Sequence, residues 1–202
     1  KENEGWYIPV RYPEKVASLF DEFSLTVILD KLKPLFEDAQ THFCGQNLKY
    51  DALVLSRYDI GLNGIVFDSM IAEHLLHPEK NSYKLDYLAL DYLNYRMKPI
   101  QDLIGKGTKQ ISMVDVPLKD IAFYATEDAD VALQVVLKQQ GIIPDENLSE
   151  PFEHIEMPLL PVLITMEENG VYLDLDFLKE LSGVLAKKLD ALILKIHSMA
   201  GH

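Results

Sequence analysis

The sequence predicts an α/β domain, because short strand-like runs and helical segments alternate along it. Apolar runs that end near Gly45 and Asp68 are each followed by a segment whose apolar residues recur at helical spacing. The chain has 202 residues, of which 48% are hydrophobic and 25% are charged, an ordinary globular composition. One domain, or one domain with part of a second, is therefore expected.

The strands are expected in the first third of the chain. Residues 6–10, WYIPV, form a β-like run whose proline favours an edge strand. Ser24 can cap a helix that begins at Leu25 and extends to about Phe36. Two further strands are expected, at 43–45 and at 65–67. The first is followed by a helix over 48–58 and the second by a helix over 69–76.

The next part of the chain is expected to be mainly helical. Ser82 can cap a helix over 83–93, and the stretch 98–112 is expected to be irregular. A long helix should begin near Pro117, a residue suited to a first helical turn, and end with Gly141 as its C-cap.

Composition changes after Gly141. Residues 142–151, IIPDENLSEP, carry prolines and acids without periodicity, which indicates a linker. An apolar helix is expected over 152–168, and Asp174 can cap a final helix. The apolar residues of that final helix recur every three or four positions: Leu178, Leu181, Leu185, Leu189, Leu192, Ile196 and Met199. Such a stripe requires a partner helix.

The net charge and the number of cysteines exclude some classes of function and of site. A formal net charge of −13 argues against binding nucleic acid through bulk electrostatics, but it permits a local site in which carboxylates hold metal ions. The single cysteine, Cys44, excludes an intrachain disulfide framework. No apolar run reaches the roughly 18 residues that a membrane span needs, so a cytoplasmic protein without a membrane partner is expected.

Two pairs of polar residues have a spacing that could carry chemistry. Asn47 and Asp51 are four positions apart and therefore share one helical face, as do Tyr124 and Asp128 on a different helix, while Asp130 points elsewhere. Carboxylates from two helices, with a tyrosine one turn before one of them, could build a metal-centred site. The alternative is structural: a favourable charge at Asp51, an N-cap at Asn47 and a core residue at Tyr124.

Several linked segments favour the metal site. GQNLKYDALVL, FDSMIAEHLLHPEKNSYKLDYLALDYL, IGKGTKQ and YATEDADVALQ resemble, in order and spacing, the 3′–5′ exonuclease domain of family A DNA polymerases. The later segment IEMPLLPVLITMEENGVYLD resembles the start of that family's polymerase domain, so the resemblance divides the chain into 1–145 and 146–202. It implies a ribonuclease-H-like mixed sheet flanked by helices, its first strands absent from this sequence, followed by an all-α thumb-type segment.

The resemblance also implies roles for individual residues. Asp51 and Asp128 match metal-binding carboxylates of the family, and Tyr124 matches the tyrosine that orients the attacking water. The implied cofactor is Mg²⁺ or Mn²⁺. The positions that line the path of a single-stranded DNA 3′ end, with Lys49 as the phosphate contact, are Gln46, Asn47, Lys49 and Tyr50.

The resemblance implies an enzyme of DNA replication and repair, a nucleotidyltransferase whose full form binds primer–template DNA with palm and fingers in the same chain. The family's first motif, Asp-x-Glu on an opening strand, is absent from this sequence, so a fragment that is inactive alone is expected. Two alternatives stay open: a ribonuclease-D-like 3′–5′ exonuclease, and a catalytically silent exonuclease-like scaffold of a polymerase.

Overall fold

A computed structural model describes residues 2–10 and 25–201 of the chain, in two compact units that divide between Thr165 and Met166. The helices and strands of the first unit are α2 (Leu25–Glu37), β1 (Phe43–Gly45), α3 (Leu48–Ser56), β2 (Ile65–Asp68), α4 (Ser69–Leu76), α5 (Leu85–Leu93), α6 (Gln101–Ile104), η2 (Gly107–Lys109), η3 (Met113–Asp115), α7 (Leu118–Asp145), α8 (Ser149–Pro151) and the π-helical η4 (Phe152–Glu156). Helix α9 (Met157–Asn169) spans the division, and α10 (Leu175–Ala200) belongs to the second unit.

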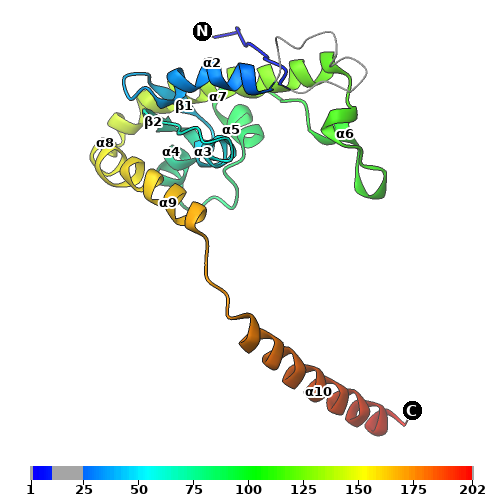
Figure 1. The fold of residues 1–202 in the computed structure, drawn as a ribbon. Coiled ribbons are helices and arrows are strands. Elements are labelled where there is room, and N and C mark those ends of the chain that lie inside the picture. Colours follow the sequence, from blue (N-terminus) through cyan, green and yellow to red (C-terminus); the bar gives the residue numbers. More distant parts are fainter. Residues whose placement is uncertain (1, 11–24, 202) are drawn as a thin grey trace. The chain divides into compact units, whose positions relative to one another are not determined.

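The expected alternation of strands and helices is confirmed around a small parallel sheet. Strand β1 pairs with β2, and Gly45 lies opposite Asp68 at the carboxyl end of the pair. Helices α3 and α4 begin directly after the two strands, so both helix N-termini lie at this edge (Figure 1). The polar residues at the start of these helices are therefore brought together, at the edge where open α/β sheets commonly place their sites.

Helix α7 joins the two apolar clusters of the first unit, and it also packs beside β1. One cluster contains Phe67, Ala72, Val136, Ile143, Phe152, Met157 and Leu160, and the other contains Leu88, Ala89, Met97, Val131 and Val135. The rings of Phe67 and Phe152 lie 4.8 Å apart between centroids, which links β2 to the π-helical segment. The polar face of α7 is thereby fixed relative to the sheet.

The sequence predictions of a strand at residues 6–10 and of a helix end at Gly141 are wrong. Residues 6–10 form no strand in the described part of the chain; just before them, Asn3 and Gly5 lie against α7, where the Asn3 amide donates to Asp130 at 2.6 Å. Pro9 has no amide proton to donate to a neighbouring strand. Helix α7 continues past Gly141 to Asp145, because Ile143 is buried in the apolar core and its packing outweighs the roughly 1 kcal/mol cost of a helical glycine.

The segment interpreted as a linker, residues 142–151, is largely helical and joins the core through Ile143. The expected cap at Ser82 is also wrong, since α5 begins at Leu85 after Lys84. Ser24 lies outside the described residues. The boundary at residue 145, which rests on family resemblance, stays a prediction beside the division of compact units at Thr165.

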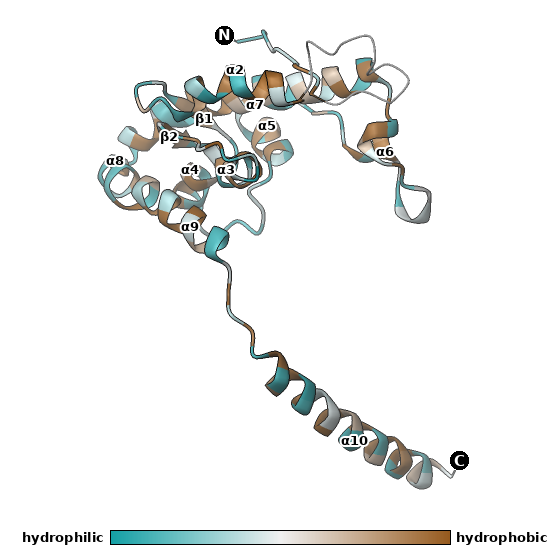
Figure 2. Cartoon of the chain, viewed as in Figure 1, coloured by the Kyte–Doolittle hydropathy of each residue, from teal (hydrophilic) through white to brown (hydrophobic). Residues whose placement is uncertain are grey.

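The second unit consists mainly of α10. Its expected cap is confirmed, because the Asp174 carboxylate accepts the amide of Phe177 at 2.9 Å. The helix has an apolar and a polar face (Figure 2). It buries none of its described residues. None of the helices in the described ranges combines the length and the apolar character required to cross a membrane.

Candidate metal and nucleic-acid site

The turn after β1 sets the start of α3. Asn47 has a left-handed backbone, with φ 58° and ψ 45°, and its side chain makes no capping hydrogen bond. The amides of Asn47 and Leu48 instead donate to the carboxylate of Asp68, at 3.1 and 2.7 Å. Asp68 thus supplies the acceptor that helix termini require, and the expectation that Asn47 caps through its side chain is wrong.

Asp51 lies one turn along α3. Its residue is exposed at the surface, yet the protein around the carboxyl group removes enough water to raise the pKa of Asp51. A backbone hydrogen bond opposes this shift, and the charge of Asp68 adds to it. The negative charge on Asp51 is consequently destabilised in the folded chain, a condition that a bound cation would relieve.

Tyr124 and Asp128 are joined by a hydrogen bond on α7. Burial and the neighbouring charge of Glu127 raise the pKa of Asp128 to about 6, although the bond from Tyr124 opposes the rise. Burial and the charge of Asp128 also raise the pKa of Tyr124, so its hydroxyl stays protonated at neutral pH and can donate. The predicted pairing of these two residues on one face is confirmed.

Asp51 and Asp128 lie on different elements, α3 and α7, and α7 packs beside β1, the strand that leads into α3. Across residues 2–10 and 25–201, no group of three or more His, Cys, Asp or Glu side chains is arranged to hold a metal. The donor set still suits a hard divalent cation, because both groups are carboxylates whose ionised forms the fold destabilises.

The four residues predicted to line a DNA path differ in accessibility. The Gln46 side chain is turned inward, where its Oε1 contacts the Ser69 hydroxyl and its Nε2 donates to the Tyr83 carbonyl at 2.7 Å. Asn47 occupies the turn itself, and Lys49 is partly buried. Tyr50 is 66% exposed, so its ring is the one most available for base stacking.

Sequence reasoning missed three buried acids, which lie on β2, α4 and α7. Asp68 caps α4 by accepting the amides of Met70 and Ile71. Glu73 accepts Lys80 Nζ at 2.7 Å, the Tyr92 hydroxyl at 2.5 Å and Gln139 Nε2 at 2.9 Å. Glu127 accepts the Tyr95 hydroxyl at 2.6 Å and the Lys98 amide at 3.0 Å. A sequence signal existed for Asp68, because an aspartate between an apolar strand and a helix is a typical N-cap.

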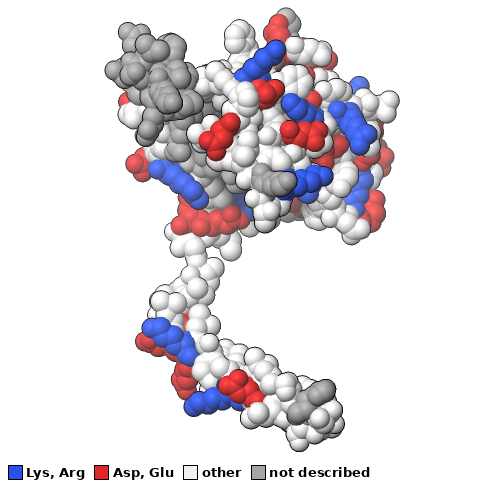
Figure 3. Space-filling view, turned by 90° about the vertical axis from the view of Figure 1, so that its right-hand side faces the viewer, with Lys and Arg blue, Asp and Glu red and all other residues white. Residues whose placement is uncertain are grey.

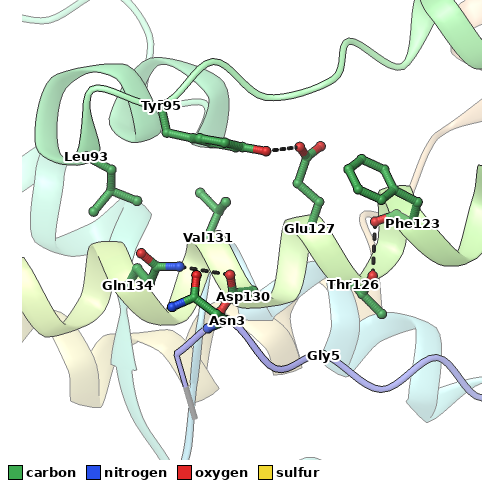
Figure 4. Close-up of a pocket in the computed structure, with 10 residues that line it drawn as sticks. All are labelled: Asn3, Gly5, Leu93, Tyr95, Phe123, Thr126, Glu127, Asp130, Val131 and Gln134. Carbon is green, nitrogen blue, oxygen red and sulfur yellow. Dashed lines mark hydrogen bonds between the residues drawn. The ribbon is translucent and has the colours of Figure 1, made fainter.

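A pocket of about 380 Å³ lies on another side of α7. Figure 4 shows Asp130 at this pocket beside Asn3 and Gln134, and its carboxylate accepts Gln134 Nε2 at 2.8 Å. The prediction that Asp130 points away from Asp128 is therefore confirmed. Acidic and basic side chains are interspersed on the face drawn in Figure 3, without a continuous basic surface in that view.

The chain is similar in sequence to known polymerases. A family model described as 3′-5′ exonuclease matches residues 4–141. DNA polymerase I of Pseudomonas aeruginosa is 34% identical over 206 residues, covering 100% of this chain and 22% of that protein. DNA polymerase I of Rhizobium leguminosarum is 32% identical over 201 residues, covering 96% of this chain and 20% of that protein. The chain thus spans about a fifth of the length of these relatives.

Two solved structures share the fold. The POL domain of Pol1 from M. smegmatis, in complex with DNA primer-template and dNTP, matches with a TM-score of 0.68 and 18% identity over 85% of this chain and 26% of that one. Brucella melitensis NrnC matches with a TM-score of 0.56 and 14% identity over 69% of this chain and 64% of that one.

Proposed function

Because the chain belongs to the 3′–5′ exonuclease family of DNA polymerase I, we propose that it contributes to a domain that hydrolyses 3′-terminal nucleotides of DNA. The observation that carries this proposal is the Tyr124–Asp128 pair on α7, whose carboxylate has a pKa raised to about 6. A partly desolvated carboxylate beside a tyrosine donor suits the binding of a cation and the orientation of a water molecule.

Asp51 and Asp128 would hold divalent cations, Mg²⁺ or Mn²⁺, through carboxylate oxygens. Bound metal ions supply an activated water and neutralise charge on the phosphate and the leaving oxygen. Tyr124 remains protonated, so its hydroxyl can donate to or accept from a water without losing its own proton. Its bond to Asp128 fixes the ring and places the hydroxyl beside the carboxylate.

The DNA partner is a single-stranded 3′ end. The exposed ring of Tyr50 can stack on a base, and Lys49 and Asn47 can contact the backbone at the start of α3. Gln46 contributes to this path indirectly, because its side chain contacts Ser69 and Tyr83 and so holds the turn before α3 in place. The same proposal includes a ribonuclease-H-like sheet and a thumb-type role for α10. It also includes primer–template binding by the whole polymerase and a cytoplasmic location.

Metal binding by the chain tests the proposal directly. Titration with Mn²⁺, followed by electron paramagnetic resonance, should show weak binding that Asp51→Asn and Asp128→Asn each reduce by about tenfold or more. Asp130→Asn is the matched control, because Asp130 lies two residues from Asp128 on α7 but at the pocket of Figure 4. Mn²⁺ binding that Asp128→Asn leaves unchanged would exclude the assigned site.

Hydrolysis is tested separately. Two carboxylates hold two cations weakly, so the chain alone is expected to leave a single-stranded oligonucleotide intact in Mg²⁺. Metal-dependent degradation that Asp128→Ala abolishes would contradict that expectation and support the proposed chemistry. Absence of Mn²⁺ binding would favour the silent scaffold instead. The ribonuclease-D-like alternative has less support, because the sequence relatives named above are DNA polymerases over nearly the whole chain.

A further inference from the structure

Asp68 occupies an unusual position at the carboxyl edge of the sheet. It is 1% exposed and lies opposite Gly45, at the end of β2. Its Oδ1 accepts the amides of Asn47 at 3.1 Å, Met70 at 2.9 Å and Ile71 at 3.4 Å. Its Oδ2 accepts the amide of Leu48 at 2.7 Å. One buried carboxylate therefore binds amides at the start of two helices, α3 and α4.

The local backbone is shaped around this carboxylate. The left-handed conformation of Asn47 directs the successive amides of Asn47 and Leu48 toward one anion, which is the geometry of a backbone nest. The positive ends of two helix dipoles add to the attraction. A Cβ atom at Gly45 would lie 2.9 Å from Leu48 Cδ2, so the strand and the first helical residue are already in close contact. The start of α3 consequently has little freedom while Asp68 is ionised and in place.

Asp68 is not itself available to a metal ion. Four amides occupy its two oxygens, and its side chain has almost no contact with solvent. Asp51, by contrast, lies one turn into α3 and is close enough to Asp68 for the two charges to interact. Any influence of Asp68 on the site must therefore act through the position of α3 and of Asp51.

We propose that Asp68 is a positioning residue that orients Asp51 toward a divalent cation by anchoring the first amides of α3. The inference rests on the function proposed above, because it assumes that Asp51 is a metal ligand. It predicts that Asp68 and Asp51 form one functional unit, although only Asp51 touches the metal. A capping residue with a merely structural role would change stability without changing the contribution of Asp51.

A double-mutant cycle in the 202-residue chain separates these roles. Mn²⁺ affinity is measured for the unaltered chain, Asp68→Asn, Asp51→Asn and the double variant. Asp68→Asn is expected to weaken Mn²⁺ binding about tenfold, and to cause no further loss once Asp51 is replaced. Unchanged affinity in a folded Asp68→Asn chain, or an equal loss in the Asp51→Asn background, would overturn the proposal.

A second variant covers the case in which Asp68→Asn does not fold. Asp68→Ser retains an N-cap oxygen for Met70 and Ile71 but is too short to hold the amides of both helices. Amide hydrogen exchange of Asn47 and Leu48 should then accelerate at least tenfold, while exchange in α4 changes less. Equal exchange in the two helices would overturn the anchoring role. If the unaltered chain showed no Mn²⁺ binding, the proposed function would fail, and the exchange data would still test the anchor.

Discussion

The acids around α3, α4 and α7 form two groups with opposite surroundings. Three acids are buried, and each of their carboxylate oxygens accepts at least one hydrogen bond. We call them the clamped carboxylates: Asp68, Glu73 and Glu127. The other two acids are the raised-pKa carboxylates, Asp51 and Asp128. Desolvation and the charge of a neighbouring acid raise the pKa of each. The difference separates acids that hold the fold together from the two acids for which we propose a bound cation.

Each raised-pKa carboxylate has a clamped carboxylate as its charged neighbour. Asp68 contributes to the shift at Asp51, and Glu127 contributes to the shift at Asp128. The clamped member of each pair accepts hydrogen bonds from the backbone or from a tyrosine, which hold it in place beside the other acid. Under the proposed function, the same arrangement would increase the affinity of Asp51 and Asp128 for a positive ion.

The largest expected loss of stability comes from removing a clamped carboxylate. Glu73→Ala removes the buried carboxylate that accepts from Lys80, Tyr92 and Gln139, although Lys80 keeps Asp91 and Gln139 keeps the Ser69 carbonyl as acceptors. Loss of one partner of a buried ion pair costs about 3–5 kcal/mol. Urea unfolding followed by circular dichroism should therefore show a decrease of about 3 kcal/mol in the free energy of unfolding.

The matched control for this clamp is Asp91→Asn. Asp91 also accepts Lys80 Nζ at 2.7 Å, but its side chain is 50% exposed. Solvent screens such a pair, so the expected loss is below about 1 kcal/mol. Similar losses in the two variants would show that burial does not distinguish the clamped acids.

Replacing Asp128, unlike replacing Glu73, is expected to increase the free energy of unfolding at neutral pH. The folded chain holds its proton with a pKa of about 6, above the ordinary 3.8, so the folded state binds more protons between these values. The free energy of unfolding should then fall as pH rises from about 4 to about 6. Asp128→Asn should remove this slope and raise the free energy of unfolding near neutral pH by about 1 kcal/mol.

The measurement is urea unfolding at several pH values, with carboxyl NMR titration of Asp128 in the unaltered chain. A midpoint near pH 4, or a loss of stability in Asp128→Asn at neutral pH, would contradict the classification of Asp128. Tyr124→Phe serves as the companion variant, because removal of its hydroxyl removes the bond that opposes the shift. The pKa of Asp128 should then rise further.

Asp51→Asn should act in the same direction with a smaller effect. The pKa of Asp51 is raised by desolvation and by the charge of Asp68, but the residue is exposed and solvent screens part of the repulsion. Unfolding measured near neutral pH should show a gain below that of Asp128→Asn. A clear loss of stability would mean that Asp51 anchors α3, in the manner of the clamped group.

The sequence predicted the fold where local signals and packing agree. The strands that end at Gly45 and Asp68 and the helix at Ser69–Leu76 were all identified from apolar runs and turn residues. Gly141 was misleading, because its helix-ending signal is local and the burial of Ile143 depends on residues far along the chain. The proline-containing run at residues 6–10 carried a strand signal, but it forms no strand in the structure.

The candidate site was predictable in part. Four-residue spacing placed Tyr124 beside Asp128, and family resemblance assigned their roles. The clamped carboxylates could not be found in this way, because Glu73 binds Gln139 from 66 positions away. The inward direction of Gln46 likewise depends on the distant Ser69 and Tyr83. Partners of that kind become visible only when the packing of α4, α5 and α7 is known.

The smallest effect is expected at Asp130, which belongs to neither group. Its oxygens accept the Asn3 amide and Gln134 Nε2, but the residue is partly exposed and lines the pocket in Figure 4. Asp130→Asn keeps one acceptor in place, so the free energy of unfolding should change by less than about 0.5 kcal/mol in urea unfolding. A loss above about 2 kcal/mol would place Asp130 with the clamped carboxylates, and two hydrogen bonds alone, without burial, would then be enough to define that group.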